Sequence, residues 1–327
     1  MEKEINLTRR DFVAVMSMAG ASLSLGGISS AVAATEETAP AAQNNAVPIY
    51  FFSKPLDRFE VGFMADTLAG AGLDGFELTV RPGGKVEPDR ADNDLPKFAE
   101  AIRNHKLALK MMVTSITGAN SPFTEKVLKA ASEVGVKHYR LGYYDYDFKA
   151  GILESLQKHK TSLQQLVAIN KQYQIQAVYQ NHSGIRVGAA VWDVWELIRG
   201  LPVEQVSMQY DVRHAVTEGA LSWILGMRLV RPYIGSLAIK DFTWNVSGGK
   251  ARAVNVPLGE GIVDFNAYFK IIKELNIKTP ISVHAEYPLL SSAEEDLSLM
   301  EKQKVITAKL KKDVDFVRTQ FANHQIV

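Results

Sequence analysis

The sequence predicts a single-domain (β/α)8 (TIM) barrel over residues 48–327, with two observations in favour. From residue 48 onward, short runs of β-branched and aromatic residues alternate with longer helical patterns. About 280 residues hold eight such runs, each followed by a helix or a long loop, which suits a barrel. The alternative is a doubly wound sheet, which would need a Gly-rich phosphate turn after its first strand. The segment Phe52-Ser53-Lys54-Pro55-Leu56 contains no glycine, so we favour the barrel.

The predicted elements follow from local patterns. Proline near a helix start, at Pro122 after Ser121, and glycine at a helix end, at Gly135, are typical boundary signals. We expect strands at residues 49–53, 75–80, 108–115, 138–143, 176–181, 206–211, 236–240 and 281–286. Helices are expected between most of them, including residues 121–134, 152–173, 188–201 and 264–275.

The first 33 residues resemble a twin-arginine export signal. Arg9-Arg10 precedes a weakly apolar run, and Ala31-Val32-Ala33 offers the small residues that a signal peptidase requires. A membrane anchor is the alternative, but the run falls short of the roughly 20 strongly apolar residues of a span. We therefore expect cleavage before Ala34, a flexible leader over residues 34–47, passage through the twin-arginine translocase, a periplasmic location and no stable membrane span after cleavage.

Composition excludes several classes of protein. The chain has 37 Lys+Arg against 36 Asp+Glu, a net charge of +1, so we expect no nucleic-acid partner. It has 0 cysteines, which removes disulfides, thiolate metal sites and cysteine nucleophiles together.

Polar residues gather where the predicted strands end. In the second strand, alternation places Glu77, Thr79 and Arg81 on one face, and Gly83-Gly84 after them forms a permissive turn. An ordinary surface ion pair beside a turn explains this segment equally well. At the end of the fifth strand, Gln180 and His182 share a face, so an amide and an imidazole would point into one pocket.

The last three strands carry further titratable groups. Asp211 ends the sixth strand, with Arg213 and His214 just beyond it; Lys240 follows the seventh, and His284 and Glu286 share a face of the eighth. Each alone has an ordinary explanation, such as a helix cap for Asp211. Together, acids, imidazoles and a lysine at one end of consecutive strands are what proton-transfer chemistry needs.

At this point the chain resembles a known family, the xylose-isomerase-like superfamily of sugar phosphate isomerases and epimerases, which are TIM barrels. The resemblance runs from about residue 51 to residue 286. It rests on an ordered series of short motifs: residues 75–84 (GFELTVRPGG), Gln180-Asn181-His182, Asp211-Val212-Arg213-His214-Ala215, Ile239-Lys240-Asp241, and Pro257-Leu258-Gly259-Glu260-Gly261 followed by Val263-Asp264-Phe265.

The resemblance implies a divalent metal held by Glu, Asp, His and Glu on strands five to eight, with the outer two carboxylates moving protons. Asp211 and Glu286 match two of these ligands, but Gln180 and Ala238 stand where the first Glu and the His are expected. One interpretation is a rebuilt site for Mn, Zn or Mg, formed by Asp211 and Glu286 with His284 or His182. The other is loss of the metal, with Lys240 supplying part of its charge.

The leading hypothesis is an exported enzyme that abstracts a proton beside the carbonyl of a non-phosphorylated sugar or keto-sugar, leading to isomerisation, epimerisation or elimination. His182, Glu286 and Lys240 are its candidate catalytic residues, with His182 as the substitute base. The candidate substrate-binding residues are Glu77, Arg81, Gln180, Arg213, His214 and Trp244. The alternative is a non-catalytic carbohydrate-binding barrel, in which aromatic residues stack on a sugar. A metal-dependent endonuclease of the same fold is disfavoured by the neutral charge and the depleted ligand set.

Overall fold

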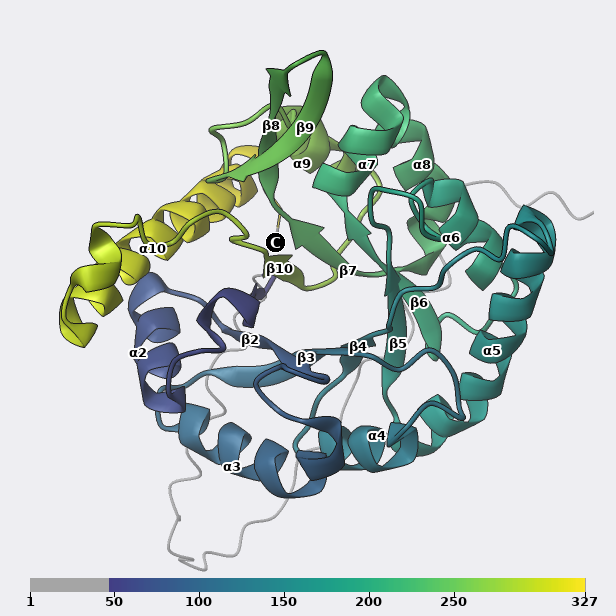
Figure 1. The fold of residues 1–327 in the computed structure, drawn as a ribbon, viewed down its shortest axis with the longest axis horizontal. Coiled ribbons are helices and arrows are strands. Elements are labelled where there is room, and N and C mark those ends of the chain that lie inside the picture. The colour runs from purple at the N-terminus through teal and green to yellow at the C-terminus, as the bar shows by residue number, and fades with distance from the viewer. Residues whose placement is uncertain (1–46, 327) are drawn as a thin grey trace, which may run out of the picture. The chain divides into compact units, whose positions relative to one another are not determined.

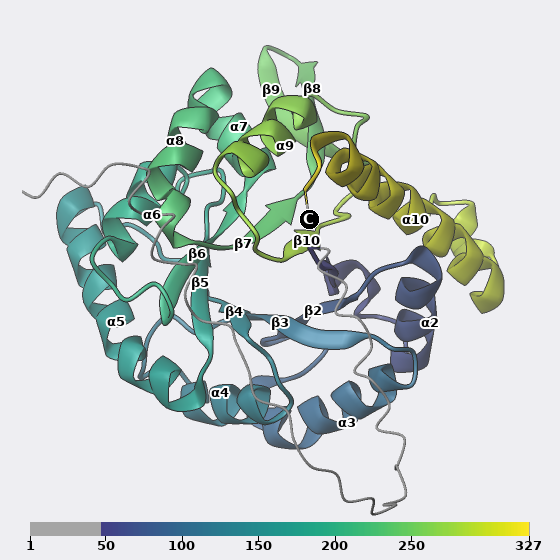
Figure 2. The ribbon, with the colours of Figure 1, turned by 180° about the vertical axis from the view of Figure 1, so that it is seen from behind.

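A computed structural model describes residues 47–326, so the predicted export signal and most of the leader lie outside the described residues. Eight parallel strands form a closed barrel in the order β1-β10-β7-β6-β5-β4-β3-β2, and helices surround it (Figures 1 and 2). The barrel strands are β1 Ile49–Phe52, β2 Gly75–Val80, β3 Ala108–Thr114, β4 His138–Arg140, β5 Gln176–Gln180, β6 Val206–Asp211, β7 Ile234–Ile239 and β10 Ile281–Val283. The predicted single-domain (β/α)8 barrel is confirmed.

The outer ring consists of helices that follow the strands along the chain. Their bounds are α2 Val61–Ala71, α3 Ala91–Arg103, α4 Thr124–Glu133, α5 Ile152–Tyr173, α6 Val191–Ile198, α7 Val212–Gly219, α8 Trp223–Val230, α9 Phe265–Glu274 and α10 Leu299–His324. The predicted helix at 152–173 has the observed bounds of α5, whereas the one predicted at 188–201 is shorter, as α6. Within residues 47–326, none of the helices is long and apolar enough to cross a membrane.

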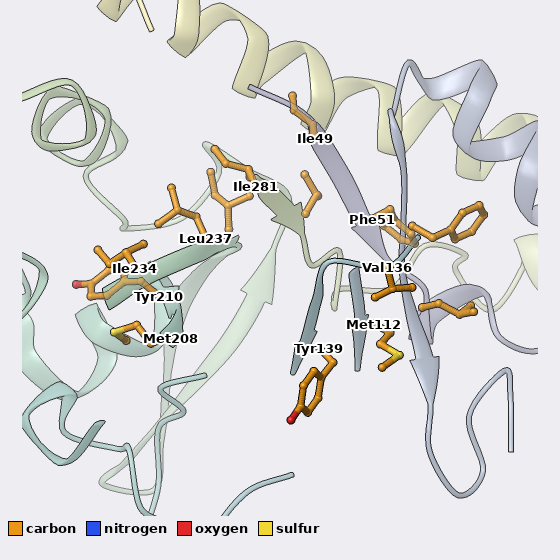
Figure 3. Close-up of a cluster of buried hydrophobic side chains, with 14 of the residues drawn as sticks. Ile49, Phe51, Met112, Val136, Tyr139, Met208, Tyr210, Ile234, Leu237 and Ile281 are labelled. Carbon is orange, nitrogen blue, oxygen red and sulfur yellow. The ribbon is translucent and has the colours of Figure 1, made fainter. Parts of the chain in front are cut away.

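Each barrel strand has two faces of different chemistry. In β6, Met208 and Tyr210 face the helices and belong to the buried apolar cluster of Figure 3, to which Ile49, Leu237 and Ile281 also contribute. The alternate residues of β6 are polar and buried, and Gln209 reaches across the barrel to β2. Because side chains alternate along a strand, the apolar layer holds the helices while the polar face is turned into the barrel.

A hairpin that the sequence did not predict follows β7. Strands β8 Asp241–Ser247 and β9 Lys250–Val256 pair antiparallel, and Gly248 and Gly249 join them at φ values of 57° and 73°. Two consecutive residues with positive φ form the tight turn that matches the twist of a hairpin, and glycine adopts this conformation without strain. The hairpin projects beside the barrel between β7 and α9 (Figure 1).

Candidate active site

The candidate site lies at the carboxyl ends of the barrel strands. Arg140, Gln180 and Asp211 are the last residues of β4, β5 and β6, and Lys240 follows β7 directly. Since all eight barrel strands are parallel, these ends meet at one rim of the barrel. Glu286 joins them from the segment after β10, because its carboxylate bonds to Lys240.

Lys240 lies between two carboxylates. Its Nζ is 2.8 Å from Glu286 Oε2 and 3.2 Å from Asp211 Oδ2, and the residue is 3% exposed. Burial acts to lower the pKa of Lys240, but attraction by Asp211 and Glu286 outweighs it and the pKa is raised. Burial acts to raise the pKa of Glu286, but Lys240 and His284 hold it well below its usual range. The cluster is therefore an ammonium shared by two carboxylates at neutral pH.

The amide of Gln180 connects this cluster to β4. Gln180 Nε2 donates to Asp211 Oδ2 at 2.8 Å, while Oε1 accepts from Arg140 Nη1 and, at 2.7 Å, from the hydroxyl of Tyr143. A carboxylate at position 180 could not donate to Asp211, whereas an amide can. Gln180 is thus suited to a site that holds no cation between positions 180 and 211.

Asp211 also begins the helix that follows it. Its Oδ1 accepts from the backbone N–H of His214 at 3.1 Å, which makes it the N-cap of α7. The helix cap uses Oδ1 and the contact with Lys240 uses Oδ2, so Asp211 serves both roles at once.

His182 presents a free ring nitrogen at the rim. Its Nδ1 lies 2.9 Å from the carbonyl oxygen of Ser183, which only accepts, so Nδ1 carries the proton and Nε2 keeps its lone pair. Among residues 47–326, the hydrogen bond from Nδ1 is the one that the His182 side chain makes, so Nε2 is left free. Burial and the Lys240 charge lower the pKa of His182, so the ring is neutral near pH 7.

His214 has the opposite tautomer. Its Nδ1 accepts from the backbone N–H of Ser183 at 3.1 Å, so its proton resides on Nε2. That Nε2 is buried, lacks a partner among residues 47–326 and lies 3.8 Å from Asp211 Oδ2. Burial, followed by Lys240 and His182, lowers the pKa of His214 well below its usual value, so this imidazole is neutral and offers one unpaired donor.

Glu77 and His284 form a separate pair inside the barrel. His284 Nε2 lies 2.9 Å from Glu77 Oε2, which also accepts from Ser282 Oγ at 2.5 Å, while Oε1 accepts from Gln209 at 2.7 Å. Burial acts to raise the pKa of Glu77, but the bonds to His284 and its neighbours lower it. The ring of His284 stacks on Phe52 with centroids 4.6 Å apart. The predicted metal ligand His284 is therefore turned toward Glu77, and both side chains are shielded from solvent.

The remaining predicted residues surround the rim. Arg81 is half-buried after β2, and Arg213 is buried in the first turn of α7, with its guanidinium 5.1 Å from the ring centroid of Phe242. Trp244 on the hairpin is 43% exposed and meets the same Phe242 edge-on.

The sequence did not predict the polar contacts of three residues in this cluster. Arg140 and Tyr143 bond Gln180, and Lys54 Nζ lies 3.8 Å from Glu286 Oε1. An arginine at the end of a buried strand is itself a signal, because a charged side chain there requires a partner inside the barrel.

Asp241 links the site to the loop before α9. Its carboxylate accepts from the backbone N–H groups of Gly259 at 3.1 Å, Gly261 at 2.8 Å and Val263 at 3.1 Å. A Cβ at position 261 would lie 2.2 Å from Asp241 Oδ1, so only glycine fits there. The Lys240-Asp241 pair thus combines a rim cation with the anchor of the loop.

The side chains present do not fit a divalent metal. In the described part of the chain, no group of three or more His, Asp or Glu side chains is arranged to hold an ion. The ammonium of Lys240 takes the place between Asp211 and Glu286, the two ligands that the sequence retains. Ala238 offers no donor atom, and the Gln180 amide turns its NH2 toward Asp211. These side chains therefore suit the ammonium of Lys240 and do not suit a divalent metal ion.

A closed eight-stranded parallel barrel with acids, imidazoles and a lysine at its carboxyl rim has the arrangement in which TIM-barrel enzymes place their active sites. The family model for the xylose isomerase-like TIM barrel matches residues 65–303, and the chain belongs to that family. No curated protein matches the sequence.

Solved structures share the fold at low sequence identity. D-psicose 3-epimerase from Clostridium cellulolyticum H10, solved with D-tagatose, is 9% identical with a TM-score of 0.63, covering 83% of this chain and 98% of that one. The 3-keto-D-glucoside 4-epimerase of E. coli is 13% identical with a TM-score of 0.60, covering 84% and 99%. A xylose isomerase-like protein from Mycobacterium smegmatis, in complex with magnesium, is 14% identical with a TM-score of 0.56, covering 82% and 98%.

Proposed function

We propose that this chain is an enzyme that removes a proton beside the carbonyl of a non-phosphorylated sugar or keto-sugar. Isomerisation, epimerisation and elimination all begin with this step. The observation that carries the proposal is the juxtaposition of a neutral histidine with a free Nε2 and a buried ammonium, at the rim where barrel enzymes perform chemistry. The family, and structural neighbours named as epimerases of D-psicose and of 3-keto-D-glucoside, support a sugar as the substrate.

The chemistry assigns one task to each group. His182 Nε2 takes the proton from carbon, which leaves an enediolate whose negative charge lies on the former carbonyl oxygen. The Lys240 ammonium and the unpaired His214 Nε2–H are the donors for that oxygen, since both are buried and fixed before the substrate arrives. The proton on His182 then returns to carbon, or to a leaving oxygen in an elimination. Glu286 holds Lys240 in position.

We also propose that the protein works outside the cytoplasmic membrane. This rests on the twin-arginine pattern of residues 1–33, which lie outside the described residues. Expression with Arg9 and Arg10 both changed to lysine tests it. The proposal expects the unchanged chain in the periplasmic fraction as a shortened form, and the double variant in the cytoplasm at full length.

Solvent deuterium exchange tests the enzyme proposal without knowledge of the product. The protein is incubated in D2O with D-psicose, D-tagatose, L-ribulose and a 3-keto-D-glucoside, and deuterium at the carbon next to the carbonyl is followed by NMR. Exchange that depends on His182 supports the proposal. Failure of every sugar to exchange, with His182→Ala indistinguishable from the unchanged protein, contradicts it.

The alternative of a non-catalytic carbohydrate-binding barrel is favoured by one observation, the exposed indole of Trp244 beside the rim. It predicts saturable binding of a sugar that is recovered unlabelled from D2O after long incubation.

A further inference from the structure

Three arginines at the rim lack the partners that arginines elsewhere in the described chain possess. Arg58, Arg90, Arg186, Arg199, Arg228 and Arg318 each pair with a carboxylate, and Arg103, Arg231 and Arg252 are exposed. Arg81, Arg140 and Arg213 are neither exposed nor paired with a carboxylate of residues 47–326. Burying a guanidinium without an anion is costly, so the exception calls for an explanation.

The carboxylates at the rim have other partners. Lys240 bridges Asp211 and Glu286 at 3.2 and 2.8 Å, and His284 is bonded to Glu77. Asp57 and Glu286 attract Arg81, and Asp211, Glu286 and Glu218 attract Arg213, but none of these carboxylates comes close enough to form an ion pair with them. Within residues 47–326 the three guanidiniums therefore have carboxylates in the neighbourhood but no direct anionic partner.

Arg140 and Arg213 present the same free edge. In each, Nη1 is engaged, by Gln180 Oε1 in Arg140 and by Ser183 Oγ at 3.0 Å in Arg213. In each, Nε is buried without a partner in the described chain, although the residues are only 5% and 7% exposed. The Nε–Nη2 edge of a guanidinium matches the two oxygens of a carboxylate with parallel hydrogen bonds.

Arg81 adds a third guanidinium on the accessible side. It is half-buried, with its guanidinium 5.9 Å from the ring centroid of Phe52, and that of Arg140 lies 5.3 Å from the same centroid. Burial and the charge of Arg140 lower the pKa of Arg81, and the attraction of Asp57 and Glu286 does not outweigh them, so a further anion here would be favourable.

We propose that the substrate is an acidic keto-sugar, whose carboxylate is bound by Arg81 and Arg140 at the rim, with Arg213 as a further donor, while its carbonyl meets Lys240. This inference rests on the proposed function and adds the substrate class to it. The sugar carries the anion, and the site provides the donors that a neutral sugar would leave unpaired.

The test compares sugars that differ only at the terminal carbon. D-fructose, D-fructuronate and D-fructose 6-phosphate, and the corresponding tagatose series, are assayed for deuterium exchange in D2O and for binding by calorimetry. We expect kcat/KM for a keto-hexuronate to exceed that for its neutral ketose by about 100-fold, as befits charge-assisted bidentate contacts. Arg81→Gln should lower this ratio at least tenfold. Arg228→Gln, which changes an exposed arginine paired with Glu274, is the matched control and should keep the ratio.

The outcomes separate the two proposals. Equal exchange of neutral and acidic sugars overturns the acidic-sugar inference while the proposed function stands. A preference for the phosphate overturns that inference and also the non-phosphorylated substrate of the proposed function. Binding of the uronate without exchange supports the carboxylate site and contradicts the enzyme. Failure of all six sugars to bind or exchange overturns both. Loss of the preference in Arg81→Gln, but not in Arg228→Gln, assigns the carboxylate to the rim.

Discussion

Replacing Lys240 with methionine should destabilise the fold strongly, because it leaves two carboxylates without their cation. At 2.8 and 3.2 Å, the two attractions are each about 5–6 kcal/mol at an effective dielectric of about 20. Desolvation of the three ions offsets much of this. Removing one member of a buried ion cluster nevertheless costs about 3–5 kcal/mol, since the remaining charges stay buried and unpaired. We therefore expect Lys240→Met to lower the free energy of unfolding by about 3–5 kcal/mol.

Urea unfolding followed by far-UV circular dichroism at pH 7 measures this loss. The matched control is Lys311→Met, because Lys311 lies 2.8 Å from Asp315 but both side chains are more than half exposed. An exposed pair one helical turn apart contributes only about 0.3–0.5 kcal/mol. The double variant Lys240→Met/Glu286→Gln should recover part of the loss, since it removes one unpaired charge. If Lys240→Met and Lys311→Met were equally stable, the ammonium would not hold the two carboxylates as described.

Three further predictions follow from other contacts. His182→Ala should reduce deuterium exchange by about 10²–10⁴-fold through loss of the base. His105→Ala, in the loop between α3 and β3 at the other end of the barrel, should stay near the unchanged rate; equal losses would contradict the assignment. Asp241→Ala should destabilise the chain by about 1–3 kcal/mol, because buried N–H groups lose their acceptor, and amide exchange should rise within residues 259–263; unchanged protection there would refute the anchor. Burial raises the pKa of Asp313 to about 6, so the fold favours its protonated form and loses stability as pH rises through that value. Relative to Asp313→Asn, the unchanged protein should lose about 2 kcal/mol between pH 4 and 7, and parallel urea midpoints across that range would contradict this.

The barrel was predictable because its signals are local. The strand at residues 206–211 alternates apolar and polar side chains, and the structure reproduces those bounds as β6. Period-2 patterns and glycine or proline boundaries are properties of short segments, so they can be interpreted without tertiary information. The hairpin after Lys240 was missed because exposed strands with a mixed pattern carry little such signal, although Gly248-Gly249 marks its turn.

The site was predictable in its members but not in its pairings. Asp211, Lys240 and Glu286 were placed at one rim from their strand positions, and the structure brings them into contact. His284 was grouped with them because it shares a strand with Glu286, yet it bonds Glu77 across the barrel. Arg140 was missed because its partner Gln180 lies on the neighbouring strand β5, not on β4. Which groups meet inside a barrel depends on strand stagger and side-chain reach, and neither can be derived from one strand at a time.

The most direct test of the account is the metal content of the purified protein. The central claim is that Lys240 takes the place of the cation that the family pattern leads one to expect between Asp211 and Glu286. Elemental analysis after purification without added metal should give far less than one equivalent of Mn, Zn or Mg, and calorimetric titration with Mn²⁺ should show no stoichiometric binding. Sugar exchange in D2O should be unaffected by a chelator. One tightly bound equivalent, with exchange abolished by the chelator and restored by the ion, would contradict the claim.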